Sequence, residues 1–228
     1  HTNHTGKSQN PEGEEQVVFG PGVIYDEIGD YRFEISPGAF FQTNTLQAER
    51  LYEVAREFAD VRPSDRLYDL YCGAGTISLF MSEHVDEVVG AELVEAAVAN
   101  ARTNAEMNGV DNCTFVGGDL KDLFTPDFVE THGRPDVILV DPPRAGMHKD
   151  VVAQIADLAP ERFVYVSCNP QTQVRDLERL RDVYRVDAVQ PVDMFPHTPH
   201  VETVVRLTAR RKKGEGGEAK GEWGEAKR

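Results

Sequence analysis

Long apolar runs and clustered cysteines are both missing from this chain of 228 residues, and each absence excludes a class of protein. No segment reaches the roughly eighteen consecutive apolar residues of a membrane-spanning helix, so we expect no membrane partner. Cys72, Cys113 and Cys168 stand far apart and form no CxxC pair, which argues against a disulfide framework or a zinc site. His197 and His200 lie close together without an HExxH pattern. We therefore predict a cytoplasmic protein in a reducing compartment, without a metal site.

Basic residues are also scarce, since 24 Lys and Arg stand against 39 Asp and Glu and give a formal net charge of −15. A surface that binds nucleic acid is usually basic, because contacts to phosphate supply most of the non-specific affinity. Two explanations of the acidity stay open: an ordinary solvated surface, or a salt-adapted source. Composition alone thus disfavours a nucleic-acid partner, and the case for one has to come from motifs.

Changes in composition divide the chain into four parts. Residues 1–16 are polar, without an apolar run or an initiator Met, and we expect a disordered segment at a cut end rather than a signal peptide. Short apolar runs broken by turn residues fill residues 17–36, which predicts a β-rich remnant of a preceding domain with a hairpin turn at Gly29-Asp30. Residues 37–211 hold the main domain, and the Gly-, Glu- and Lys-rich residues 212–228 predict a flexible tail.

Apolar strands and amphipathic helices alternate along the main domain. Residues 44–60 and 93–108 show the apolar spacing of helices, the first behind a candidate N-cap at Asn44. Near-continuous apolar runs lie between helical segments, at residues 66–72, 87–92, 113–117, 136–140 and 162–168. This alternation predicts an α/β fold with a doubly wound, mostly parallel sheet covered on both faces. Residues 184–195 and 200–210 follow without a helix between them, which predicts an antiparallel edge on what becomes a seven-stranded sheet.

Ligands in an open α/β sheet bind at the carboxyl ends of the strands, so the residues after each predicted strand are functional candidates. Residues 71–76, YCGAGT, follow the first strand. Gly73 and Gly75 allow the backbone to turn sharply and to approach a ligand closely. The pattern departs from GxGxxG at Ser78, which weakens a dinucleotide-binding interpretation. A tight turn without a ligand is the alternative.

Acidic residues follow the next three strands. Glu92 stands where a carboxylate suits the ribose hydroxyls of a nucleoside cofactor, although it also suits the first turn of a helix. Asp119 is placed to contact an adenine amine or to cap a helix. Asp141 precedes two prolines, which hold the chain extended and present its carboxylate rigidly at the strand end.

The fifth strand ends in the motif SCNP, which contains Cys168. A cysteine at a strand end that faces a ligand crevice is a candidate nucleophile. A buried and unreactive thiol is the alternative, because that is the usual state of a free cysteine, and we expect it for Cys72 and Cys113. Position alone does not decide between the two interpretations of Cys168.

Five motifs together resemble the RNA uracil-C5 methyltransferases that act on ribosomal or transfer RNA. In chain order they are FEISPGAFFQTN, LYDLYCGAGTISL, VILVDPPRAGM, VYVSCNPQTQVRDL and PVDMFPHTPHVETVVRL. The resemblance covers roughly residues 22–208 and implies the catalytic domain of such an enzyme, with a class I, Rossmann-like methyltransferase fold. It implies that Cys168 is the nucleophile and Glu202 the general base. It also implies an S-adenosylmethionine site, which yields S-adenosylhomocysteine, formed by Gln42, Tyr71, Glu92, Asp119 and Asp141. Thr76 lies in the same loop as Gly73 and Gly75 and is a further candidate beside these two glycines.

The chemistry of C5 methylation explains why a thiol and a carboxylate occur together. Addition of a thiolate to C6 of uracil makes C5 nucleophilic, and a base then removes the C5 proton so that the thiolate can leave. The thiol must ionise, so we expect a positive or hydrogen-bonding neighbour, with Arg144 as the candidate. The uracil must also leave its stack, and Phe40, Phe41 and Phe195 are candidates for stacking or for core packing.

Other functions stay open at this point. An amino-methyltransferase grips adenine with an Asp-Pro-Pro-aromatic loop, but Arg144 stands at the aromatic position and that chemistry needs no cysteine. A catalytically silent RNA-binding fragment with the same fold is a second alternative, and a Rossmann oxidoreductase explains neither SCNP nor HVET. Family members usually carry an amino-terminal RNA-binding domain and some an iron–sulfur cluster, neither of which we expect in this fragment. We expect a monomer that acts on RNA, ribosomal in preference to transfer RNA.

Overall fold

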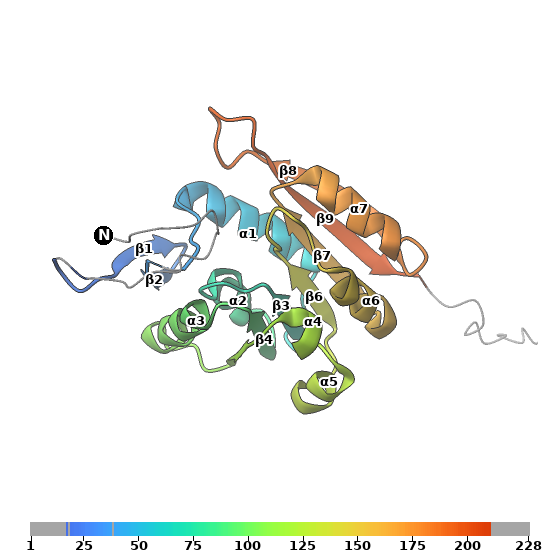
Figure 1. The fold of residues 1–228 in the computed structure, drawn as a ribbon, viewed down its shortest axis with the longest axis horizontal. Coiled ribbons are helices and arrows are strands. Elements are labelled where there is room, and N and C mark those ends of the chain that lie inside the picture. The colour runs from blue at the N-terminus through green and yellow to red at the C-terminus, as the bar shows by residue number, and fades with distance from the viewer. Residues whose placement is uncertain (1–16, 18, 38, 211–228) are drawn as a thin grey trace, which may run out of the picture.

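The computed structural model describes residues 17, 19–37 and 39–210, so the segments predicted for residues 1–16 and 212–228 lie outside the described residues. The described chain forms a small hairpin, a large sheet and helices on both faces of that sheet (Figure 1). The hairpin consists of β1 (Ile24–Ile28) and β2 (Tyr31–Ile35). The large sheet contains β3 (Arg66–Leu70), β4 (Glu87–Glu92), β5 (Cys113–Gly117), β6 (Val137–Val140), β7 (Arg162–Ser167), β8 (Tyr184–Val192) and β9 (Glu202–Ala209). The helices are α1 (Thr45–Ala59), α2 (Thr76–Ser82), α3 (Glu95–Met107), α4 (Leu120–Leu123), α5 (Pro126–His132), α6 (Lys149–Leu158) and α7 (Pro170–Leu180).

The strand order of the large sheet is β5-β4-β3-β6-β7-β9-β8. β3 pairs in parallel with β4 and β6, whereas β9 pairs antiparallel with β7 and β8. The first strand of this sheet, β3, therefore lies in its middle. β4 and β5 extend the sheet on one side of β3, and β6 and the strands after it extend the sheet on the other side. This order confirms the predicted doubly wound, seven-stranded sheet with an antiparallel edge.

Alternate residues of each strand pack on opposite faces of the sheet, and each face has its own helices. Leu67 and Leu139 belong to the core that α1, α2 and α3 cover. Tyr68 and Ile138, the adjacent residues, belong to the core beneath α4 to α7. All four side chains are fully buried, which explains why these strands read as near-continuous apolar runs in the sequence.

The hairpin lies beside α1 and α3 (Figure 1). Ile28, Phe33 and Ile35 enter the same core as the helices of that face. Gly29 has a φ of 57°, the left-handed conformation that a two-residue hairpin connection requires, so the predicted turn is confirmed. The hairpin is thus packed on the main domain, and its origin as the remnant of a preceding domain stays a prediction.

Element boundaries differ from the predicted ones mainly at the carboxyl ends of strands. α1 begins after Asn44, whose side chain accepts a hydrogen bond from the Gln47 N–H over 3.3 Å, as predicted. β3 ends at Leu70 because Tyr71 takes a left-handed conformation, with a φ of 71°. β7 likewise ends at Ser167. Tyr71 and Cys168 therefore lie just beyond their strands, whereas Glu92 is the last residue of β4 and Glu202 the first residue of β9.

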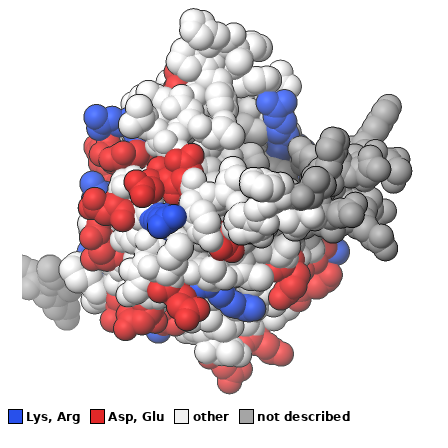
Figure 2. Space-filling view, turned by 90° about the vertical axis from the view of Figure 1, so that its left-hand side faces the viewer, with Lys and Arg blue, Asp and Glu red and all other residues white. Residues whose placement is uncertain are grey.

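Acidic side chains cluster on the side of the molecule that Figure 2 presents, with Lys and Arg scattered between them. On this side the acidic excess of the sequence is carried by the solvated surface. Among the described helices none is long and apolar enough to cross a membrane.

Candidate active site

The strand order reverses between β3 and β6. Such a reversal leaves a crevice at the carboxyl edge of the sheet, where α/β proteins bind their ligands. The glycine loop, defined as residues 71–76, follows β3, and Asp141 follows β6. The Asp141 N–H donates to the Leu70 carbonyl over 3.4 Å, which keeps the two strand ends together. Both sequence motifs therefore lie at the point of the carboxyl edge where the strand order reverses.

The glycine loop passes through three left-handed residues before α2 begins. The φ angles of Tyr71, Gly73 and Gly75 are 71°, 55° and 80°. A Cβ on Gly75 would lie 3.0 Å from the Ala101 Cβ and from a Phe115 ring carbon, so a side chain does not fit where the loop approaches α3. A Cβ on Gly73 would meet no atom within 4 Å. Gly75 is therefore required by packing, whereas Gly73 borders open space.

The Glu92 side chain, at the end of β4, forms a hydrogen bond to the glycine loop. One carboxylate oxygen accepts a hydrogen bond from the Gly73 N–H over 3.1 Å, and the other accepts one from the Val94 N–H over 2.8 Å. A carboxylate can accept about four hydrogen bonds in all. Glu92 therefore orders the loop and keeps acceptor positions for hydroxyl groups of a ligand.

Ser78 and Asp69 form a buried pair beneath the glycine loop. Ser78 Oγ donates to Asp69 Oδ2 over 2.6 Å, and both residues are fully buried. Burial raises the pKa of Asp69 to about 7. The other oxygen, Oδ1, has no hydrogen-bond partner among the described residues. Sequence reasoning treated Ser78 only as a departure from a glycine pattern and so missed this pair.

Thr76 and Asp119 are already engaged by neighbouring residues. Thr76 Oγ1 shares a hydrogen bond of 2.9 Å with the Tyr52 hydroxyl of α1. Asp119 caps α4 by accepting from the Lys121 N–H over 3.2 Å, so its interpretation as a helix cap is confirmed. Its contact with the Lys121 ammonium also lowers the pKa of Asp119.

Gln42 is buried in the segment between the hairpin and α1. Asn44 Nδ2, two residues later, donates to the Met194 carbonyl over 2.9 Å. Because Met194 follows β8, this hydrogen bond holds the segment at the carboxyl edge of the sheet. Gln42 therefore stands near the end of the sheet that carries the other predicted site residues.

The antiparallel pairing of β7 and β9 places Cys168 opposite Glu202. Ser167 pairs with Thr203 at the end of the ladder, so the next residue of one strand faces the preceding residue of the other. A parallel β9 would begin at the far end of the sheet. The reversal of this strand is therefore what brings the thiol and the carboxylate together.

Charges act strongly on one another around Cys168. Burial raises the pKa of the Cys168 thiol, and the negative charges of Glu202 and Asp141 raise it further. The Arg144 guanidinium opposes this shift, so the predicted cationic neighbour is present but outweighed. Burial also raises the pKa of Asp141 and of Glu202. These four groups form one electrostatic unit at the carboxyl edge.

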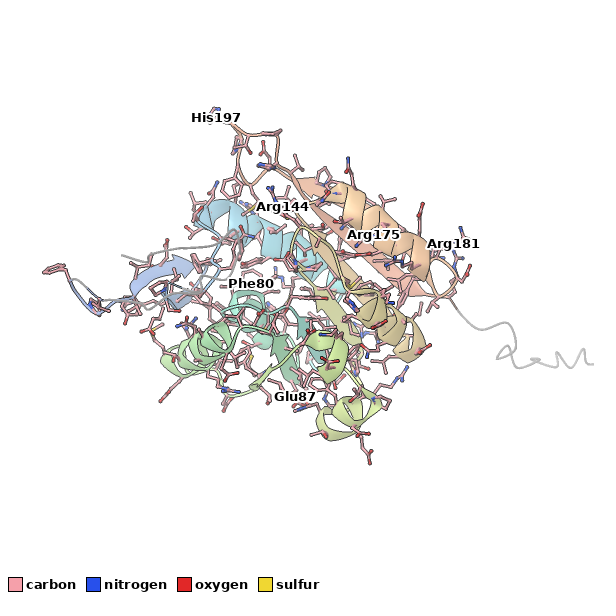
Figure 3. The ribbon with its side chains drawn as sticks, viewed as in Figure 1. Phe80, Glu87, Arg144, Arg175, Arg181 and His197 are labelled. Carbon is pink, nitrogen blue, oxygen red and sulfur yellow. The ribbon has the colours of Figure 1, made fainter. Side chains whose placement is uncertain are left out.

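Both the side chain and the backbone of Arg144 form hydrogen-bond contacts with neighbouring segments. Its Nη2 lies 3.1 Å from His200 Nδ1, within hydrogen-bond distance. Its backbone carbonyl accepts hydrogen bonds from Asn169 Nδ2 over 3.1 Å and from Thr172 Oγ1 over 3.2 Å. Figure 3 shows Arg144 on the same side of the sheet as the protruding loop that carries His197. The segments after β6 and β7 are thus joined at this residue.

Two buried polar residues of α7, which sequence reasoning missed, form hydrogen bonds to β7 and β9 or to the segment after β6. Gln173 Nε2 donates to the Tyr165 carbonyl of β7 over 3.0 Å and to the Thr203 carbonyl of β9 over 3.1 Å. Asp176 Oδ2 accepts from the Met147 N–H over 2.8 Å and from the Tyr165 hydroxyl over 2.9 Å. Polar residues on an amphipathic helix usually indicate its solvated face, so the sequence pattern gave no signal for these two.

The three candidate stacking residues divide into two groups. Phe41 packs against the core with its ring centroid 5.8 Å from that of Phe33, and Phe195 packs against the same core. Phe40 is 70% exposed. Phe40 is therefore the one of the three that is free to stack on a base.

The surroundings of the two other cysteines disfavour their thiolate forms. Burial raises the pKa of Cys72, and it raises the pKa of Cys113 to about 12. Their prediction as inert thiols agrees with this environment. Within the described part of the chain, no group of three or more His, Cys, Asp or Glu side chains could hold a metal ion.

Comparison with known proteins gives consistent matches. The family model described as tRNA (uracil-5-)-methyltransferase matches residues 24–125 and 127–210. An uncharacterized RNA methyltransferase of Bacteroides thetaiotaomicron is 52% identical over 194 residues, which are 85% of this chain and 43% of that protein. One of Porphyromonas gingivalis is 50% identical over 199 residues, 86% of this chain and 43% of that protein. The chain thus spans less than half the length of these curated relatives.

Solved structures extend the comparison to the fold. The Pyrococcus abyssi tRNA (uracil-54, C5)-methyltransferase in complex with S-adenosyl-L-homocysteine matches with a TM-score of 0.76 and 36% identity, over 90% of this chain and 49% of that one. A tRNA m1G37 methyltransferase of M. jannaschii matches with a TM-score of 0.60 at 12% identity, over 89% of this chain and 60% of that one. The second match concerns the fold alone, and together they confirm the predicted methyltransferase fold. With its motifs, its sheet and nearly all of its described residues matched, this chain belongs to the tRNA (uracil-5-)-methyltransferase family.

Proposed function

We propose that this chain is a catalytic domain that methylates C5 of a uridine in RNA, with S-adenosylmethionine as methyl donor and Cys168 as nucleophile. The observation that carries the proposal is the position of Cys168 opposite Glu202, beside Asp141 and Arg144 at the crevice of the sheet. An amino-methyltransferase with the same fold needs neither the thiol nor the paired carboxylate. Family membership and the cofactor product in the Pyrococcus abyssi relative support the same assignment.

The crevice beside the glycine loop fits such a cofactor. Gly73 borders open space, and the buried Asp69 Oδ1 lacks a hydrogen-bond partner among the described residues. Glu92 keeps acceptor positions for ribose hydroxyls, and Asp119 lies at the next strand end for the adenine. Gln42, Tyr71, Gly75, Thr76 and Asp141 complete the proposed site. When bound, S-adenosylmethionine supplies an electrophilic methyl group on a positively charged sulfur.

The residues of the chain perform the addition and the elimination. Cys168 gives its proton to water and its thiolate bonds to C6 of the uracil. C5 then bonds to the methyl group, whose bond to sulfur breaks to leave S-adenosylhomocysteine. Glu202 accepts the proton from C5, the bond between C6 and sulfur breaks, and the C5–C6 double bond returns. The raised pKa of Glu202 suits a group that must hold a proton for part of each cycle.

RNA is the proposed substrate, and we infer a monomer that acts in the cytoplasm. The net charge is −15, Arg144 contacts His200 and Arg175 pairs with Asp176, so the proposal of an RNA substrate rests on family membership and on the position of Cys168, not on free cations. The family description and the Pyrococcus abyssi structure name transfer RNA, whereas we expected ribosomal in preference to transfer RNA, although the motifs resemble enzymes that act on either. The experiment therefore includes both classes.

The test uses S-adenosylmethionine labelled in its methyl group, with transfer RNA and ribosomal RNA in separate reactions. We expect label in 5-methyluridine after digestion to nucleosides, at one mapped position in one RNA class. Cys168→Ala serves as the control and should transfer no label. Label in an amino-methylated base, or label that persists in Cys168→Ala, would contradict the proposal.

A further inference from the structure

Two asparagines of α3 and Asn108, which caps its C-terminal end, lie along the outer edge of β2, where a neighbouring strand would otherwise pair with the hairpin. Asn100, Asn104 and Asn108 are four residues apart, so they project from one face of α3 at intervals of about 6 Å. Alternate residues of a β-strand repeat at about 6.7 Å, which is close to that interval. Successive asparagines therefore contact alternate residues of this segment. Asn100, the first of them, accepts a hydrogen bond from the Ser36 hydroxyl, just beyond the end of β2.

Asn104 and Asn108 each bind both backbone groups of one residue of β2. Asn104 Oδ1 accepts from the Glu34 N–H over 2.7 Å, and its Nδ2 donates to the Glu34 carbonyl over 3.3 Å. Asn108 does the same with the N–H and the carbonyl of Arg32, over 2.9 Å and 2.7 Å. The asparagine side chains therefore form, with the outer edge of β2, the hydrogen bonds that a neighbouring strand would otherwise form.

Asn104 alone of these asparagines also reaches the glycine loop. Its Nδ2 donates a second hydrogen bond, of 3.0 Å, to the Ala74 carbonyl. Ala74 lies between the left-handed Gly73 and Gly75, and Gly75 itself packs closely on Ala101 of α3. Asn104 is fully buried, so its loss would remove the partner of buried backbone groups in the hairpin and in the loop at once.

We propose that Asn104 is a positioning residue that couples the hairpin to the glycine loop, so that cofactor binding and ordering of β2 stabilise each other. The proposal rests on the assignment of residues 71–76 to the cofactor site. The two protons of one amide nitrogen serve the Ala74 and Glu34 carbonyls. A movement of the hairpin away from α3 therefore displaces the group that holds the loop.

Asn108 provides a matched control within the same helix. It holds β2 through the same pair of backbone hydrogen bonds, but its additional bond, of 2.7 Å, goes to the Asn104 carbonyl of its own helix. Loss of Asn108 loosens the hairpin without removing a contact to the glycine loop. A difference between the two variants therefore isolates the coupling.

The first measurement compares Asn104→Ala and Asn108→Ala by thermal unfolding and by calorimetric titration with S-adenosylhomocysteine well below the unfolding midpoint. We expect both substitutions to lower the midpoint, because each removes hydrogen bonds to β2. Asn104→Ala alone should weaken the affinity, by about threefold to tenfold. Asn104→Asp with Asn108→Asp forms a second pair, which keeps the acceptor for the β2 N–H and loses the donors. Equal affinity in the parent and in the Asn104 variants would overturn the coupling.

Hydrogen exchange distinguishes coupling from a merely structural role of Asn104, because a structural role predicts no effect of the ligand on exchange in the hairpin. Because coupling is reciprocal, saturating S-adenosylhomocysteine should slow exchange of the Glu34 amide in the parent. Asn108→Ala should keep this slowing and Asn104→Ala should lose it. An exchange rate of the Glu34 amide that stays the same with and without the ligand in the parent would overturn the proposal.

Gly75→Ala tests the underlying assignment separately. The added methyl group would clash with Ala101 and Phe115, so affinity for S-adenosylhomocysteine should fall if residues 71–76 form the site. Unchanged affinity in Gly75→Ala would contradict the cofactor site itself. Weakened affinity in Gly75→Ala with unchanged affinity in Asn104→Ala would contradict the coupling alone.

Discussion

The two halves of the carboxyl edge are built from different kinds of contact. The cofactor half, which we define as residues 71–76 with Glu92, Asp119 and α3, is held largely through backbone groups. Glu92 binds the Gly73 N–H, and Asn104 binds the Ala74 carbonyl. Left-handed glycines and a neutral amide thus fix its shape.

The catalytic half, which we define as Arg144, Cys168 and Glu202, is dominated by ionisable side chains, and Asp141 lies between the two halves. The pKa of the Cys168 thiol is raised by burial and by Glu202, and lowered by Arg144. Here a change at one group alters the proton affinity of the others.

The difference teaches that binding and chemistry are separable in this fold. Substitutions in the cofactor half should change the affinity for the ligand and leave the pKa of the Cys168 thiol unchanged. Substitutions in the catalytic half should change proton affinities and turnover and leave ligand affinity as it is, since distant sites without shared partners act independently.

Cys168→Ala should have the largest effect. Methyl transfer should fall by about ten-thousandfold or more, because no other described thiol lies opposite Glu202. Affinity for S-adenosylhomocysteine should stay within about twofold of the parent. Transfer of labelled methyl groups and calorimetry measure the two effects. Loss of cofactor affinity in this variant would break the division between the halves.

Glu202→Gln should lower turnover by about a hundredfold to ten-thousandfold, because the C5 proton then has no base. An RNA–protein adduct should accumulate on denaturing gels. The pKa of the Cys168 thiol should fall, since the charge of Glu202 raises it, and the pH profile of thiol alkylation measures this. Parent-like turnover would mean that another group removes the proton.

Glu92→Gln should weaken S-adenosylhomocysteine binding by about tenfold, because a charged acceptor for the Gly73 N–H is lost. The alkylation profile of Cys168 should coincide with that of the parent. Calorimetry and alkylation on the same preparation test both statements. A shifted alkylation profile would show that the two halves are coupled after all.

Arg144→Met should raise the pKa of the Cys168 thiol, because the guanidinium lowers it in the parent. Alkylation at neutral pH should become slower, and the profile should move to higher pH. Cofactor affinity serves as the control and should not change. Faster alkylation would contradict the sign of this interaction.

Asp69→Asn should have the smallest effect, on the pH dependence of stability. The pKa of Asp69 is about 7 in the folded chain against an ordinary value of 3.8, so between these pH values the folded state binds more protons than the unfolded state. The free energy of unfolding should therefore fall as pH rises from about 4 to 7. Asp69→Asn should flatten this slope in urea unfolding at a series of pH values. An unchanged slope would remove Asp69 as its source.

The sequence predicted the parts of the site that depend on strand ends. Gly73, Glu92, Asp141 and Cys168 each follow an apolar run, and the carboxyl-edge rule turns such positions into candidates. The assignment of Glu202 came from resemblance, because pairing with Cys168 depends on the register of β7 and β9, which periodicity does not encode.

The residues that support the site escaped prediction for a physical reason. Gln173, Asp176 and Asn104 are polar, and a polar residue in an amphipathic helix normally faces water. In this fold they are buried and bind backbone groups of segments distant in sequence. Only the three-dimensional arrangement reveals those partners.

The central claim is that Cys168 bonds to C6 of a uridine in RNA. Its most direct test is mass spectrometry of the protein after reaction with S-adenosylmethionine and RNA transcribed with 5-fluorouridine. Fluorine at C5 leaves Glu202 no proton to remove, so the adduct cannot resolve. We predict a methylated fluorouridine on the peptide that contains Cys168, and no adduct with Cys168→Ala. An adduct on Cys72 or Cys113, or transfer to ordinary RNA without an adduct on Cys168, would contradict the claim.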